Sequence, residues 1–93
     1  MKLPHRIRIK AKVTYQVVWV DSFKDPKQRG ECDDLAKQIA ILKGMSERET
    51  LETFIHELLH AVELEYGIPI PHRLIYMLEM PFVKLAKLNG WIK

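Results

Sequence analysis

Hydrophobic and polar residues alternate at the start of the chain, and a β-branched and aromatic run follows, so that residues 6–20 have the pattern of extended chain. A period of two buries one face of a strand and leaves the other in solvent. The segment exceeds the usual strand length of about 5–6 residues, so we expect a bend or turn near Lys12. A short apolar run, Gln38–Leu42, predicts a third strand that Gly44 closes. The polar residues 21–34 are interpreted as a loop.

A change to helical periodicity begins at Ser46. The Ser46 hydroxyl can cap a helix, and Glu49, three residues later, completes a capping box. Gly67 suits the carboxy-terminal cap, and the prolines after it prevent continuation. Apolar residues recur at helical spacing between these ends and form one stripe: Leu51, Ile55, Leu58, Leu59, Val62 and Tyr66. The pattern predicts one amphipathic helix from Ser46 to Gly67.

A second helix is predicted from Pro71, a favoured first position, to residues 89–90. Pro81 interrupts it and should kink the helix just after Glu79, because proline removes one intrahelical hydrogen bond. The core candidates of this helix are its aliphatic residues Leu74, Ile75, Leu78, Val83, Leu85, Ala86 and Leu88. Trp91 and Ile92 are expected to cover core surface, or alternatively to lie across a cleft and hold the protein latent.

These elements predict an α+β fold with a small, mostly antiparallel sheet of about three strands packed on two main helices. A chain of 93 residues can bury only one modest core, so residues 1–93 are expected to form a single domain. The sequence does not indicate an oligomeric state.

Composition and charge indicate the cellular location of the protein more than its function. No apolar run reaches the roughly 20 residues that span a bilayer, and residues 1–6 lack the apolar stretch of a signal peptide. A single cysteine, Cys32, cannot form an intrachain disulfide. We therefore expect an intracellular, cytoplasmic protein with no membrane partner.

The formal net charge of +3 is too small to indicate nucleic-acid binding by itself. The alternating segment carries a basic row that could contact DNA. A solvated outer sheet face is the better interpretation, because no aromatic residues interleave with the charges. The row consists of Arg6, Arg8, Lys10 and Lys12.

The segment His56-Glu57-Leu58-Leu59-His60 has the pattern HExxH. Residues four apart lie on one side of a helix, so both imidazoles can bind one ion at about 2.0–2.1 Å. Glu57 lies about 60° beyond His60 around the axis, at about 100° per residue. From there its carboxylate can take a proton from a water that the metal activates, and later pass it to a leaving amine.

The alternative interpretation is a pair of solvated surface histidines. With four histidines in the chain, HExxH has a chance probability of about 1%. Context favours the metal site, because the motif lies in a helix that capping and periodicity predict independently. Its histidines also flank the apolar stripe instead of lying within it.

A catalytic zinc needs a third protein ligand and one open position. Glu79 is the first candidate, because a short connection could bring the next helix beside His60. His72, near the start of that helix, is second, and could instead contact substrate or lie on the surface. Glu63 would strain to share the ion, and Cys32 is more typical of a small apolar packing residue.

Residues 53–61, Thr-Phe-Ile-His-Glu-Leu-Leu-His-Ala, resemble the active-site helix of zincin metallopeptidases. With a downstream glutamate on a second helix, the chain resembles the gluzincin branch, including the minimal soluble gluzincins and short SprT-like proteins. The resemblance implies a zincin-like fold, Zn²⁺ held by His56, His60 and Glu79, and Glu57 as general base and acid.

Two departures from related patterns limit the resemblance. Glu63 and Tyr66 stand where the metzincin branch needs glycine and histidine, so that branch is excluded. Val83 stands where some gluzincins carry an aspartate that orients a histidine.

By the same resemblance, a peptide or protein substrate is expected to bind as an extra strand on a sheet edge, for which residues 37–42 are the candidate. Tyr76 or His72 could stabilise the oxyanion.

The sequence therefore predicts a zinc-dependent peptidase. One alternative is a non-catalytic module that holds zinc with four protein ligands, Cys32 or His72 among them. A second enzymatic alternative is a deformylase-like enzyme with Cys32 as a ligand, but the sequence lacks the glycine-rich surroundings expected for it. A metal-free scaffold is the remaining alternative.

Overall fold

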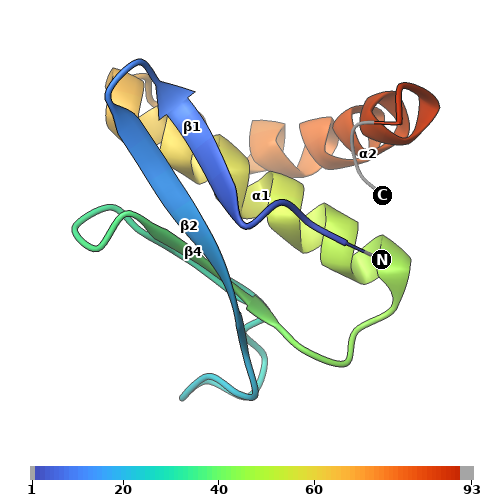
Figure 1. Cartoon of the computed structure of the whole chain (residues 1–93). Coiled ribbons are helices and arrows are strands. Elements are labelled where there is room, and N and C mark those ends of the chain that lie inside the picture. Colours follow the sequence, from blue (N-terminus) through green and yellow to red (C-terminus); the bar gives the residue numbers. More distant parts are fainter. Residues whose placement is uncertain (1, 91–93) are drawn as a thin grey trace.

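The computed structural model describes residues 2–90 and consists of a four-stranded sheet and two helices (Figure 1). Along the chain the elements are β1 (Arg6–Lys10), β2 (Val13–Val20), β3 (Gly30–Asp33), β4 (Gln38–Leu42), α1 (Glu47–Tyr66) and α2 (His72–Leu88). The α+β prediction is confirmed, with one strand more than expected.

The sheet has the order β1-β2-β4-β3, in which only the β2–β4 pair is parallel. The expected turn near Lys12 separates β1 from β2. Two predictions about the remaining strands are wrong. Part of the predicted loop 21–34 forms β3, and β4 lies between two strands, so residues 37–42 are not an edge. β3 is an edge strand instead.

The predicted caps of α1 are confirmed. The Ser46 side chain accepts a hydrogen bond from the Glu49 backbone N–H, and the Glu49 side chain accepts one from the Ser46 N–H. At the other end, Gly67 adopts φ 65°, which only glycine reaches without steric cost, and its N–H bonds to the Glu63 carbonyl. The HExxH segment therefore lies within a 20-residue helix fixed at both ends.

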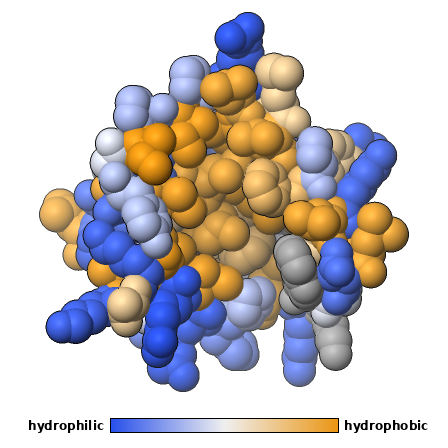
Figure 2. Space-filling view, turned by 90° about the horizontal axis from the view of Figure 1, so that it is seen from above, coloured by the Kyte–Doolittle hydropathy of each residue, from blue (hydrophilic) through white to orange (hydrophobic). Residues whose placement is uncertain are grey.

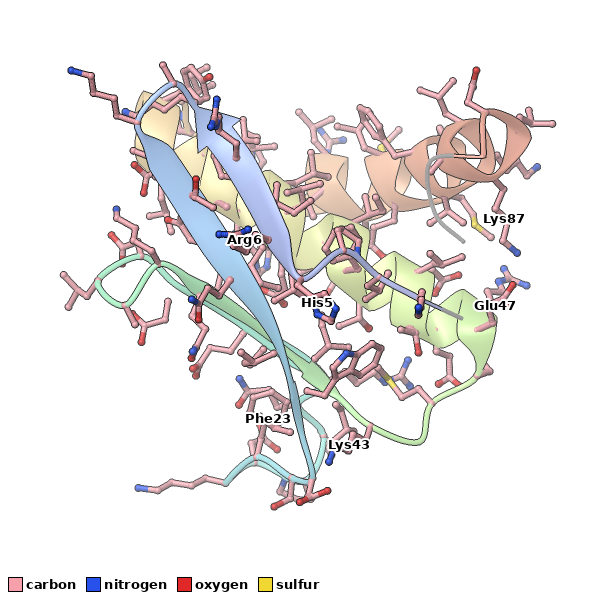
Figure 3. The ribbon with its side chains drawn as sticks, viewed as in Figure 1. His5, Arg6, Phe23, Lys43, Glu47 and Lys87 are labelled. Atoms are coloured by element: carbon pink, nitrogen blue, oxygen red, sulfur yellow. The ribbon has the colours of Figure 1, made fainter. Side chains whose placement is uncertain are left out.

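α1 lies across one face of the sheet, and α2 packs on α1 rather than on the strands (Figure 1). Figure 3 shows Lys87 and Glu47 facing each other, and their charged groups are 3.4 Å apart. This pair joins the last turn of α2 to the first turn of α1. The two helices therefore run antiparallel, which brings the start of α2 beside the second half of α1.

The core lies between the sheet and α1. Its largest fully buried side chains are Tyr15, Ile39, Ile41 and Leu51, and Ile75 of α2 is buried to the same degree. The exposed side chains of the basic row agree with the solvated face expected for it.

The core predicted for α2 is largely wrong. Only Ile75, Val83 and Ala86 are buried there, because among residues 2–90 the helix α2 packs on α1 and on no other helix or strand. Large apolar side chains of α2 are exposed instead: Leu74, Tyr76, Met77, Leu78, Phe82, Leu85 and Leu88. Seen from above, the molecule shows a broad group of hydrophobic side chains over the centre of this face (Figure 2).

α2 continues as one helix through Pro81. Trp91 and Ile92 lie outside the described residues. Among residues 2–90, neither helix has the length and apolar character needed to cross a bilayer.

Candidate metal centre

Three histidines converge between α1 and the start of α2. The Nε2 atom of His60 lies 3.2 Å from that of His56 and 3.1 Å from that of His72. One ligand atom from each residue can be chosen so that all three lie within 4.8 Å of one another. We call His56, His60 and His72 the histidine cluster.

Carboxylates contact the outer nitrogens of two of these rings. Glu79 Oε2 lies 2.7 Å from His56 Nδ1, and Glu63 Oε1 lies 3.1 Å from His60 Nδ1. An ionised carboxylate can only accept, so each Nδ1–H donates, and a neutral ring then has a lone pair on Nε2. If both rings are neutral, the Nε2 lone pairs of His56 and His60 face each other, and a proton or a metal cation between them relieves the repulsion.

Two of the three nitrogen–nitrogen spacings in the cluster match those around a tetrahedral metal ion. Tetrahedral zinc binds imidazole nitrogen at about 2.0–2.1 Å, which places two ligand nitrogens about 3.3 Å apart. The two Nε2 distances, 3.2 and 3.1 Å, are close to this value. The donor set also fits zinc, because neutral imidazoles with carboxylates on their outer nitrogens are typical of its sites.

Glu57 is buried, with 8% of its surface exposed, on the same turn of α1 as His56. Burial raises the pKa of Glu57 to about 6, and the nearby His56 opposes this shift. A carboxyl group whose pKa lies near neutrality is suited to exchanging protons.

Gly30 of β3 makes room for Glu57, and sequence analysis missed this role. A Cβ at position 30 would lie 2.6 Å from Thr53 Cγ2 and 3.0 Å from Glu57 Cγ. Glycine therefore lets the edge strand approach the motif helix closely. An isolated glycine in a strand is a known signal of such close approach, but residues 21–34 were not interpreted as containing a strand.

A cavity of about 440 Å³ opens beside the cluster. Its size is in the range of about 300–1,000 Å³ that is usual for ligand sites. It is lined by Lys27, Arg29, Gly30, Glu52, Thr53, His56, Glu57, Tyr76 and Glu79. The Tyr76 ring also lies 5.2 Å from that of His56, between centroids.

The structure arranges the predicted site residues differently from their ranking by sequence. His72, the second candidate, joins the motif pair, whereas Glu79 contacts the outer side of His56. Cys32 is half-buried against the core and lies outside the histidine cluster. Burial raises the pKa of its thiol to about 12, which disfavours the thiolate that binds metal.

Comparisons with protein-family models, curated proteins and solved structures give no match for this chain. The functional argument therefore depends on the site itself.

Proposed function

We propose that this protein is a zinc-dependent peptidase whose ion is held by the Nε2 atoms of His56, His60 and His72. The convergence of three imidazole nitrogens beside the buried Glu57 carries the proposal. The substrate is a peptide or protein, and the cytoplasmic setting expected from the sequence is part of the proposal.

The residues of the site then have defined tasks. A zinc ion bound there supplies a Lewis acid that polarises a peptide carbonyl and acidifies water. Glu57 accepts a proton as water attacks the carbonyl carbon, and it donates a proton to the nitrogen as the C–N bond breaks. Tyr76, which lines the cavity, is the candidate donor of a hydrogen bond to the carbonyl oxygen.

The geometry favours His72 over Glu79 as the third ligand. His72 already directs a nitrogen toward His60, whereas Glu79 would have to leave His56 Nδ1 to reach an ion on the opposite side of that ring. In this arrangement Glu79 fixes the tautomer and orientation of His56. Carboxylates in this position are common partners of metal-binding histidines.

In this proposal the substrate peptide binds along the outer edge of β3. β3 lies beside Glu57 through Gly30, and an edge strand offers unpaired backbone groups to an extended peptide. Backbone pairing of this kind tolerates many sequences.

The alternative of a structural zinc module needs a fourth protein ligand. The described part of the chain brings three candidate ligands together, and one of them, His72, is exposed to solvent. Three ligands and an open position are typical of catalytic zinc.

Replacing Glu57 with Gln tests the reaction. We expect Glu57→Gln to keep its zinc, because Glu57 is not a ligand, and to lose peptide cleavage by at least about 100-fold, the lower range for a general base. Zinc content and turnover of a fluorogenic peptide library are the two readouts. Full cleavage by this variant would refute the mechanism, and zinc binding without cleavage by the unmodified protein would favour the structural module.

A further inference from the structure

Two cationic side chains lie at one end of the site cavity. Lys27 and Arg29 line the same cavity as His56 and Glu57, and both precede the edge strand β3. They belong to residues 21–34, the segment interpreted from the sequence as a loop, and the proposed peptidase mechanism assigns them no task.

The chain that carries these two cations has a defined conformation. The Lys27 N–H donates to Asp25 Oδ1 at 2.9 Å, and the Gln28 N–H donates to the Asp25 carbonyl at 3.1 Å. The Gln28 side chain donates to the Gly30 carbonyl. These bonds form a turn that fixes the backbone of Lys27 shortly before β3.

Arg29 is held by a contact with the first turn of α1. Its guanidinium lies 3.2 Å from Glu49 Oε2, and Glu49 is the capping-box residue of α1. One carboxylate oxygen leaves the other guanidinium donors available. Arg29 therefore joins the loop to the helix and also lines the cavity.

The cavity holds three carboxylates, those of Glu52, Glu57 and Glu79, and of its two cations only Arg29 is paired within the described part of the chain. Glu52 pairs with Arg48 at 3.0 Å, and Glu79 contacts His56. Lys27 forms no ion pair with any residue from 2 to 90. A divalent ion on the histidine cluster would offset part of the negative charge that Glu57 and Glu79 bring to this cavity.

We propose that Lys27 and Arg29 form a carboxylate-binding subsite, so that the enzyme prefers peptides with a carboxylate close to the cleaved bond. The inference depends on the proposed peptidase activity. The carboxylate belongs either to an Asp or Glu side chain or to a free carboxyl terminus. A peptide paired with the edge of β3 would pass these two cations directly, because they precede Gly30 in the chain.

Matched peptides test the preference. One set carries Glu or Gln at each position near the cleaved bond and has an amidated end, and a second set has neutral side chains and a free or amidated end. We expect about fivefold higher kcat/KM for the anionic member of one set, the upper range for one exposed ion pair. The preference should fall as salt is added.

Lys27→Glu should abolish this preference or reverse it, and Arg29→Lys should retain part of it. Lys24→Glu is the matched control, because Lys24 is an exposed lysine of the same loop that does not line the cavity. Binding of the same peptides to the zinc-loaded Glu57→Gln protein, measured by calorimetry, gives a second readout independent of turnover.

The outcomes separate the two proposals. If the unmodified protein binds zinc and cleaves no peptide, the proposed function is wrong. If it cleaves peptides with equal efficiency whatever their charge, or if Lys27→Glu and Lys24→Glu behave alike, the subsite is wrong and the peptidase remains.

Discussion

Two polar clusters on α1 differ in how their groups are matched. The histidine cluster brings together like groups, with nitrogens 3.1 and 3.2 Å apart. The second, which we call the Glu65 cluster, joins Glu65 to Tyr15, Lys37 and Lys10. There Tyr15 donates to Glu65 Oε2 at 2.6 Å, Lys37 donates to the same oxygen, and Lys10 donates to the Glu65 carbonyl at 2.7 Å.

The difference separates a structural role from a functional one. Every group of the Glu65 cluster finds a complementary partner within the chain, so the cluster connects α1 to the sheet without needing anything else. In the histidine cluster the imidazole nitrogens converge on one another, and a proton or, as proposed, a zinc ion would lie between them. Polar groups that are satisfied in the fold stabilise it, whereas convergent groups of one kind indicate a ligand.

Three substitutions test the difference between the two clusters, and the one at Glu79 should have the largest effect. If Glu79 orients His56, Glu79→Ala should weaken zinc binding by about 10–100-fold, as for other partners of ligand histidines. Competition with a chromophoric chelator measures the affinity. Glu52→Ala is the control, because Glu52 lines the same cavity without contacting a histidine of the cluster. A loss as large as that caused by removing His60 would identify Glu79 as a ligand.

A smaller effect is expected from Gly30, which belongs to β3 and lies against Thr53 and Glu57 of α1. In Gly30→Ala, the new methyl group meets Thr53 Cγ2 at 2.6 Å and forces β3 away from α1. Overpacking of this kind costs about 1–3 kcal/mol of unfolding free energy. The urea concentration at the midpoint of unfolding should fall because of the overpacking. Peptide turnover should fall because Glu57 is displaced. Gly44→Ala is a control without close contacts, although its φ of 85° adds strain. Unchanged turnover in Gly30→Ala would contradict the close fit.

The smallest effect is expected in the Glu65 cluster and depends on pH. Burial and the hydrogen bond to Glu65 raise the pKa of Tyr15 above its ordinary value of 10.0. The folded state therefore holds this proton more tightly, and the stability from Tyr15 is lost as the pH rises beyond 10.0. Hydrogen bonds from Lys37 and Tyr15 lower the pKa of Glu65 below 4.5, so its contribution is lost as the pH falls through the lowered value.

Tyr15→Phe should cost about 1 kcal/mol of unfolding free energy near neutral pH, the usual net value of a hydrogen bond. It should also remove the alkaline decline due to Tyr15 and leave zinc affinity unchanged. Chemical denaturation as a function of pH measures the first two quantities. Tyr66→Phe is the matched control, because its hydroxyl bond to the Ile9 carbonyl is exposed. A fall in zinc affinity in Tyr15→Phe would mean that the two clusters are not independent.

Local signals made α1 predictable from the sequence. Its beginning at Ser46, its end at Gly67 and its motif all depend on residues within a few positions of one another. β3 was missed because Gly30–Asp33 has no strand pattern of its own and is a strand only through pairing with β4. That pairing also moved the edge of the sheet away from residues 37–42.

The third member of the cluster could not be chosen from the sequence. Both His72 and Glu79 were candidates, and their order depends on how α2 crosses α1 and on which side of His56 each side chain reaches. The bond from the Ile70 N–H to Glu63 Oε2, 2.7 Å long, fixes the connection before His72, and no local pattern encodes it. The exposed apolar face of α2 was missed for a similar reason, since periodicity does not tell how many neighbours a helix has.

Zinc affinity and coordination of the unmodified protein, compared with His72→Ala and His5→Ala, test the central claim most directly. His5 is the one histidine of the chain that is not part of the histidine cluster, and it lies just before β1 (Figure 3). We predict one zinc ion per chain with imidazole ligands in X-ray absorption spectra, a loss of affinity beyond about 100-fold in His72→Ala, and no change in His5→Ala. A protein that binds no zinc, or equal affinities for the two variants, would contradict the account.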